Sequence, residues 1–191
     1  MIRNRLLLFA ALVSALSSAA AGLAASKPKA KPAPQAATPA DPGPAKSLGS
    51  AGAWTAYLAQ NKAGKVCYIV GHPEKSEPSS MRRKTVMAMV THRTQDNVSN
   101  VVSFDEGYEL DETDDAIVEV GSDKYPLFAK DDTAWARTSD LDKTIVDALI
   151  KGKDATVHGK PKKGRPTADT YSLAGFSKAL SLIDKACDVK R

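Results

Sequence analysis

The three histidines are the residues of this chain with the widest choice of chemistry. A neutral imidazole can act as a general base or bind zinc, and the histidines are His72, His92 and His158. Zinc needs three or four converging ligands, and no two of these side chains have the spacing of a ligand pair on one helix or loop. We therefore expect three surface histidines, with no catalytic residue, no metal and no cofactor.

Charged runs could bind ions instead. The acidic run at residues 111–115 lacks the alternating ligands of a calcium loop, so it predicts an exposed turn, with a weak Ca²⁺ contact as the alternative. The basic run at residues 82–84 could bind a carboxylate or a phosphate, or lie in solvent where a strand begins. A second basic run lies at residues 160–165. The candidate contact surface comprises Arg82, Arg83, Lys160, Lys162, Lys163 and Arg165.

No signature of a known enzyme class occurs in the sequence. It contains no Gly-x-Ser-x-Gly elbow, no phosphate-binding glycine loop and no dinucleotide fingerprint. A triad assembled only in the fold would need one of three histidines as its base. The sequence therefore favours a protein that is not an enzyme.

The first fifty residues predict export followed by a spacer. Arg3 and Arg5 precede an apolar run at residues 6–16 and small residues ending at Ala21, which is the layout of a secretory signal peptide. The run is shorter than the roughly 20 residues that span a bilayer. We expect a signal peptide at residues 1–21, with cleavage as late as residue 25 as the alternative, and no transmembrane segment afterwards.

Residues 26–50 contain six of the eleven prolines and four lysines, without any apolar period. Such a composition predicts an extended, flexible linker. The alternative is a basic arm in peripheral contact with anionic head groups or cell-wall polymer of the envelope.

Two cysteines, Cys67 and Cys187, remain in a chain that we expect to reach an oxidising compartment. With no Cys-x-x-Cys motif present, a disulfide between them is the expected state, and two buried free thiols are the alternative. The bond would tie the end of the chain to an early strand. The chain-entropy model allows roughly 4 to 5 kcal/mol for a loop of this length.

The net charge of +5 arises from the first fifty residues. With Arg3, Arg5, four lysines and one aspartate set aside, residues 51–191 carry 21 basic and 21 acidic residues. A neutral domain gives little support to nucleic-acid binding, so we expect none. Eleven acids lie at residues 105–132 and six bases at residues 151–165. This separation could orient a partner, or the two segments could be separately solvated loops.

Short runs of β-branched and aromatic residues, bounded by turn residues, predict most of the domain as strands. The expected strands are residues 54–58, 66–70, 85–92, 98–104, 116–120, 125–128, 133–136, 155–158 and 168–173. Pro126 would place its strand at a sheet edge. Residues 139–150 change to a helical period, with Ser139 as N-cap and Gly152 after the end.

The last helix follows a distinctive stretch. Phe176, Ala179, Leu180, Ile183 and Cys187 recur on one helix face, and Ser172 or Gly175 would begin it. Two helices in the C-terminal third and about nine strands predict a mainly β fold in one domain at residues 51–191. It would be an antiparallel β-sandwich, or an α+β variant with helices covering one end. The stretch before the helix contains Asp169, Tyr171, Ser172, Leu173, Gly175 and Phe176, which we expect to be structural.

This stretch resembles the C-terminal signature of the invasion-associated locus B (IalB) family, small exported proteins of alphaproteobacteria. Other matching landmarks are Trp54, Cys67-Tyr68, Gly107-Tyr108, Trp135 and Leu149-Ile150-x-Gly152. The family often carries Arg-Gly-Thr before the signature, where this chain has Lys163-Gly164-Arg165-Pro166-Thr167.

The resemblance implies an exported, non-enzymatic protein that acts through surface contacts in host-cell invasion (virulence) or in envelope function. It would reside in the periplasm, at the outer membrane or outside the cell, with an unknown protein or envelope partner. An apolar patch or a bipolar surface should accompany that role. Two alternatives remain: an assembly factor or chaperone that uses an open sheet edge, and a small-ligand binder or enzyme with a pocket of converging polar groups.

Overall fold

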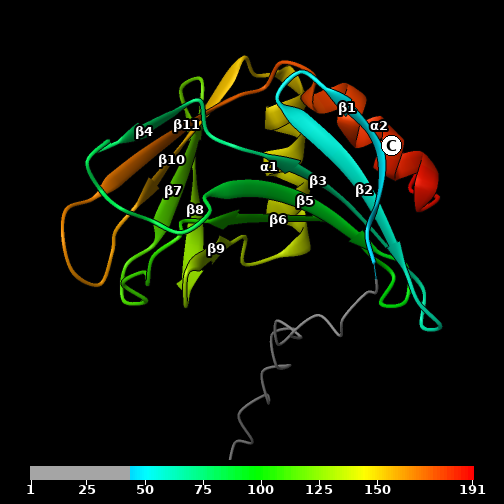
Figure 1. Cartoon of the computed structure of the whole chain (residues 1–191), viewed down its shortest axis with the longest axis horizontal. Helices are drawn as coiled ribbons and strands as arrows, with labels where there is room; N and C mark the ends of the chain where they lie inside the picture. Colours follow the sequence, from blue (N-terminus) through cyan, green and yellow to red (C-terminus); the bar gives the residue numbers. More distant parts are fainter. Residues whose placement is uncertain (1–43) are drawn as a thin grey trace, which may run out of the picture. The chain divides into compact units, whose positions relative to one another are not determined.

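The computed structural model of the chain describes residues 44–191 (Figure 1). Eleven strands and two helices occur in that range. In chain order they are β1 (Lys46–Ala51), β2 (Trp54–Gln60), β3 (Lys65–Gly71), β4 (Lys75–Glu77), β5 (Met87–Arg93), β6 (Val98–Asp105), β7 (Ala116–Val120), β8 (Asp123–Lys130), β9 (Thr133–Trp135), α1 (Ser139–Lys151), β10 (Asp154–Gly159), β11 (Thr167–Ser172) and α2 (Phe176–Ala186).

The strands form one antiparallel sheet that bends at β8. Its order is β1-β2-β3-β5-β6-β9-β8-β7-β10-β11-β4. We call β1, β2, β3, β5, β6 and β9 sheet A, and β7, β10, β11 and β4 sheet B. The first part of β8 pairs with β7 and its last three residues pair with β9, so this strand joins the two sheets.

Pro126 therefore does not lie in an edge strand of the whole sheet, and that prediction is wrong. Pro126 pairs with Ile117 of β7 on one side and has no strand partner on the other, because β9 pairs only with residues further along β8. Proline has no N–H to donate, and on that open side there is no neighbouring strand to accept one. The edge is local to one half of β8.

The start of the folded region also differs from the prediction. Residues 46–50, assigned to the linker, belong to β1, which pairs with β2. Leu48 packs against the core, a contact between distant segments that local composition does not reveal. The predicted signal peptide at residues 1–21 and the linker up to residue 43 lie outside the described residues.

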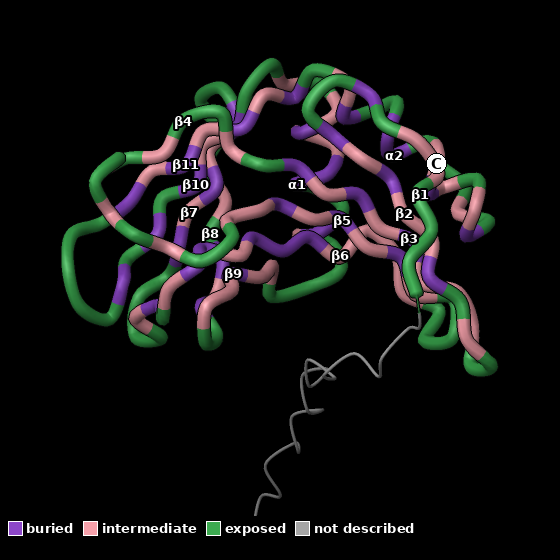
Figure 2. Tube along the Cα trace, in the orientation of Figure 1, coloured by how far each residue is buried: buried purple, intermediate pink, exposed green. Residues whose placement is uncertain are grey.

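Sheets A and B contribute their inner faces to a single core, together with both helices. Along β5 and most of β3, buried and half-buried residues alternate (Figure 2). The ring of Phe104 in sheet A lies 6.1 Å from that of Tyr171 in sheet B. α2 packs on β1, β2 and β3, and α1 packs on β6 (Figure 1). The mainly β fold with two late helices is thus confirmed.

α1 provides a hydrogen-bond acceptor for β6 beyond the point where β9 ends. β9 pairs only with Ser103 to Asp105 of β6, so Val102 has no partner residue in β9. Buried Asp142 of α1 accepts a hydrogen bond from the Val102 N–H at 2.8 Å. Burial raises the pKa of Asp142 to about 6, although the bond from Val102 opposes the rise. Thr138, one residue before the predicted Ser139, is the N-cap and accepts from Leu141 N–H.

The two ends of the sheet are short or irregular. β4 has three residues and is followed by Pro78, and β1 contains a bulge between Ser47 and Gly49. Neither strand is predicted from the sequence, because β4 lies in a Pro- and Ser-rich stretch and β1 in the predicted linker. Short, bulged edges discourage the addition of another strand, so this architecture does not favour a strand-holding chaperone.

The disulfide prediction is confirmed. Cys67 of β3 and Cys187, the residue after α2, form a bond across a separation of 120 residues. Both side chains are buried. Lys65 adds a hydrogen bond from its Nζ to Ala186 O at 3.0 Å. The end of α2 is therefore fixed to the middle of sheet A.

Replacing both cysteines with alanine should lower the free energy of unfolding by roughly 3 to 5 kcal/mol, because the unfolded chain regains the freedom of a long loop. Urea denaturation of the oxidised protein and of the double variant measures the difference. Wild-type protein alkylated with and without reductant should differ in gel mobility; identical mobility would exclude the bond in the purified protein.

Candidate functional site

The strongest cluster of charged side chains in the described structure is buried. Asp169 of β11 is 0 % exposed and accepts two hydrogen bonds from the guanidinium of Arg83, both at 2.6 Å. Ser76 of β4 donates a third at 2.5 Å. Only 5 % of the Arg83 side chain is exposed. This bidentate pair fixes the segment after β4 against sheet B.

A second carboxyl group adjoins the pair. Glu106 follows β6, is 0 % exposed, and places Oε2 3.9 Å from Nη1 of Arg83. The hydroxyl of Tyr108 donates to the same Oε2 at 3.2 Å and lies 2.6 Å from the hydroxyl of Thr167. A Cβ on Gly159 would lie 2.3 Å from the Tyr108 hydroxyl, so only glycine fits beside the cluster.

One guanidinium cannot neutralise two buried carboxylates. Burial and then the charge of Asp169 raise the pKa of Glu106 to about 8, against weaker opposing contributions from Tyr108 and Arg83. Glu106 is therefore mainly protonated at neutral pH. Within the described part of the chain, Glu106 Oε1 and the Tyr171 hydroxyl are buried without a hydrogen-bond partner. Arg83 and Asp169 bind each other, so this pair holds β11 and the segment after β4 together.

The remaining signature residues join β11 to α2. Trp54 Nε1 donates to Ser172 O at 2.8 Å, and the Trp54 ring meets Phe176 edge-on at 4.9 Å. Leu173 is buried. Gly175 has φ +88°, and a Cβ there would lie 2.1 Å from Ala51 O. Glycine is required because the backbone turns left-handed and approaches another backbone at the same point. These contacts hold the end of β11 and the start of α2 against β2.

His92 is not at the surface, and that prediction is wrong. It lies on the inner face of β5 with 1 % of its area exposed. Its Nδ1 accepts from Asn100 N–H at 3.0 Å, so its proton sits on Nε2 and is donated to Asp184 at 2.9 Å. Burial opposes ionisation of Asp184, but hydrogen bonds from His92 and Arg191 hold its pKa below the usual range. His72 and His158 are exposed, as predicted.

The acidic and basic segments, separated along the chain, are paired in space. Lys160 Nζ lies 3.1 Å from Asp111 and 2.6 Å from Asp114, and Lys162 Nζ lies 2.9 Å from Glu109. Backbone hydrogen bonds also join the two segments, from Asp111 N to Lys160 O and from Lys162 N to Glu109 O. Lys160 and Lys162, two of the six bases of the basic segment, are therefore neutralised by the acidic segment.

The acidic run is an exposed turn, as predicted. Hydrogen bonds from Thr113 and then Lys160 lower the pKa of Asp111 to about 2. Across residues 44–191, no group of three or more His, Cys, Asp or Glu side chains is placed to hold a metal ion.

The predicted contact surface separates into three groups. The prediction that Arg83 belongs to this surface is wrong, because its side chain is buried against Asp169. Lys160 and Lys162 are exposed but paired with the acidic segment. The exposed cations that remain are Arg82, Lys163 and Arg165.

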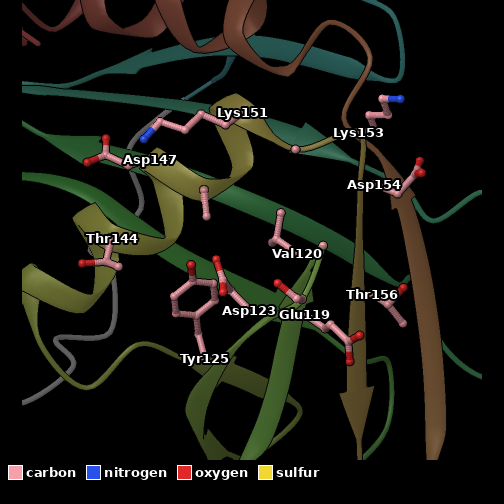
Figure 3. Close-up of a pocket in the computed structure, with 14 residues that line it drawn as sticks. Glu119, Val120, Asp123, Tyr125, Thr144, Asp147, Lys151, Lys153, Asp154 and Thr156 are labelled. Carbon is pink, nitrogen blue, oxygen red and sulfur yellow. The ribbon is translucent and has the colours of Figure 1, made fainter.

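A hollow of about 840 Å³ lies between α1, the β7–β8 turn and the start of β10 (Figure 3). Its labelled polar lining includes Glu119, Asp123, Tyr125, Thr144, Asp147, Lys151, Lys153, Asp154 and Thr156. Two of its four acids have partners outside the hollow: Glu119 pairs with Lys124 at 3.1 Å, and Asp147 with Lys143 at 2.5 Å.

The solvent side of sheet A is unusually apolar. Strand register places Tyr57, Tyr68, Thr91 and Val101 in one row, and Val70, Met89, Ser103, Trp135 and Phe128 in the next. We define the outer face of sheet A by its half-buried apolar members Tyr57, Val66, Tyr68, Val70, Met87, Met89, Val101, Phe128 and Trp135. None of them belongs to the core or packs against it, and the rings of Tyr57 and Tyr68 stack at 5.3 Å.

Comparison with known proteins agrees with this architecture. The family model described as "Invasion associated locus B (IalB) protein" matches residues 54–184. The chain belongs to the IalB family. The crystal structure of invasion associated protein B from Bartonella henselae matches with a TM-score of 0.54 and 19 % identity, covering 75 % of this chain and 99 % of that one. At this identity the IalB structure supports the fold alone. No curated protein matches the chain.

The IalB family segment contains no helix suited to crossing a membrane. Among residues 44–191, neither helix is long and apolar enough to do so.

Asp169→Asn should destabilise this IalB chain by roughly 3 to 5 kcal/mol, because it leaves the buried guanidinium of Arg83 without a charged partner. Urea denaturation at neutral pH gives the free energies of unfolding. Asp154→Asn, at an exposed position, is the matched control and should change stability by less than about 0.5 kcal/mol. A loss below about 1 kcal/mol at Asp169 would contradict the importance of the pair.

Glu106→Gln should change how stability depends on pH. The folded chain holds a proton on Glu106 up to a pKa of about 8, whereas the unfolded chain releases it near the ordinary value of 4.5. Wild-type stability should therefore fall as pH rises between these values. The glutamine variant should lose that decline and be the more stable protein at pH 8.

Urea midpoints measured from pH 4.5 to pH 9 test this expectation. Glu74→Gln, at an exposed position, should keep the wild-type profile. Parallel profiles for wild type and Glu106→Gln would show that Glu106 is ionised in the folded chain at neutral pH.

Proposed function

We propose that this chain is an exported, non-enzymatic protein of the cell envelope that acts through surface contacts, in host-cell invasion or in envelope function. The observation that carries the proposal is the outer face of sheet A. An antiparallel sheet with one packed face usually has polar residues on the other. Here the helices and core occupy the inner face, and the outer face still carries three kinds of aromatic ring, two methionines and several valines.

The composition of this face matches that of protein interfaces. Aromatic residues and methionine are enriched in the centres of interfaces, and tryptophan and tyrosine supply much of the binding energy. Tyr57 and Tyr68 stack across neighbouring strands, so their rings present a rigid platform that loses little side-chain entropy on binding. Trp135 and Phe128 extend the same face beside β8. A contiguous apolar face of this kind marks an interaction site.

Two further observations support the proposal. The groups with the largest pKa shifts, Glu106 and Tyr171, are buried in the core beside the Arg83–Asp169 pair, which supports a structural role for them instead of catalysis. The disulfide is of the kind that persists in oxidising compartments, which supports export by the predicted signal peptide. The periplasm, the outer membrane and the exterior are all compatible with these observations.

Tyr57→Ser combined with Tyr68→Ser should abolish partner capture and leave the fold intact. Each ring lies outside the core, so its removal should affect binding more than stability. The exported protein, immobilised at micromolar concentration, is incubated with envelope extract and with host-cell extract, and retained proteins are crosslinked and identified. Capture by the double variant should fall at least about tenfold, equivalent to the loss of about 1.4 kcal/mol of binding energy.

Tyr125→Ser serves as the control because Tyr125 is a half-buried tyrosine of sheet B that packs against the core. It should retain the partner. Failure of the wild-type protein to retain any partner, or equal retention by all three proteins, would count against the proposed function.

A further inference from the structure

The three exposed cations left over from the predicted contact surface belong to two loops on sheet B. The first loop is residues 78–84, after β4, and the second is residues 161–166, between β10 and β11. β4 pairs with β11, with Glu77 opposite Ala168, so the loops leave the sheet together. Met81 Cε lies 4.0 Å from the position of a Cβ on Gly164. Both loops are mostly exposed at this side of sheet B (Figure 2). We call them the basic loop pair.

Three cations of the basic loop pair are not used by the fold. Arg82, Lys163 and Arg165 form no hydrogen bond or ion pair within residues 44–191. Lys160 and Lys162 differ, because the acidic segment neutralises them. Arg82, Lys163 and Arg165 are therefore unpaired cations on neighbouring loops, and they leave a local positive field that is open to a ligand.

The loops enclose a hollow whose lining suits a sugar. It has a volume of about 580 Å³, and Arg165, His158, Ser79 and Ser80 line it. The hydroxyl groups can exchange hydrogen bonds with sugar hydroxyls, and the guanidinium can bind a carboxylate in two-point geometry. Glu77 is the acid in the lining, and Lys75 neutralises it at 2.5 Å.

One residue that lines the hollow also contacts the buried cluster. Thr167 lines the hollow and also lies 2.6 Å from the Tyr108 hydroxyl in the buried cluster. Arg83, next to Arg82 in the chain, is fixed by Asp169. The loop carrying Arg82 is therefore anchored one residue away from its exposed charge. Such anchoring reduces the ordering that a ligand must impose when it binds.

We propose that the basic loop pair binds the acidic groups of an anionic polysaccharide. A flat lipid surface fits less well, because the hollow that Arg165 lines is concave. This inference deepens the proposed function, since it rests on the chain being exported to where such polymers occur. It uses a surface distinct from the outer face of sheet A.

Binding of the purified, disulfide-bonded exported protein to polygalacturonate tests the proposal. Wild-type protein should bind this carboxylate polymer and not neutral dextran, and binding should weaken as salt is raised. The triple variant Arg82→Gln, Lys163→Gln, Arg165→Gln should raise the dissociation constant at least about tenfold. These side chains are exposed and unpaired, so the thermal midpoint should be unchanged.

The matched control is the triple variant Lys62→Gln, Lys178→Gln, Lys185→Gln, which removes the same net charge from exposed positions elsewhere. It should bind within about twofold of wild type. An equal loss in both triple variants, binding to dextran, or binding to phosphatidylglycerol vesicles without binding to the polymer would each overturn the proposal. Because polymer and protein are both purified, a failure of partner capture by the outer face of sheet A does not affect this result.

Discussion

A buried arginine needs a charged or hydrogen-bonding partner. For Arg83 that partner is Asp169, and this contact determines how β4 and β11 of sheet B are held together. The two hydrogen bonds of Arg83 to Asp169 join a loop after β4 to β11, and Ser76 adds β4 itself to the same carboxylate. Breaking such a pair is costly even where forming it adds little net stability. The pair therefore acts mainly on specificity: it determines where the short strand β4 and the following loop must lie.

A second constraint fixes the opposite end of β11. The backbone at Gly175 meets the backbone at Ala51, Trp54 packs against Phe176, and the disulfide closes the far end of α2 on β3. A helix as short as α2 has little stability alone, so it depends on being held at both ends. The stretch from Asp169 to Phe176 thus connects the buried ion pair of sheet B with the helix that covers sheet A.

Features with a local cause could be predicted from the sequence. The period of α1, the helical face of α2 and most strands depend on neighbouring residues, and the cysteine pair depends on composition and compartment. Arg83 and His92 could not be placed, because their burial depends on Asp169 and Asp184, which are far away in the chain. β1 and β4 were missed for the same reason. One signal was available for the outer face: Val66, Tyr68 and Val70 alternate with apolar residues, so neither side of β3 is polar.

Local cancellation of charge has a consequence for how the surface can act. Because Lys160 and Lys162 are paired with acids, the charge separation suggested by the sequence is reduced, and the unpaired cations Arg82, Lys163 and Arg165 leave a small field. Such a field acts within about one Debye length, roughly 8 Å at physiological ionic strength. It can therefore select a ligand that reaches the hollow, but it cannot steer a large partner toward the outer face of sheet A. Binding at that face must depend on apolar contact, which salt weakens little, so the two surfaces should respond differently to ionic strength.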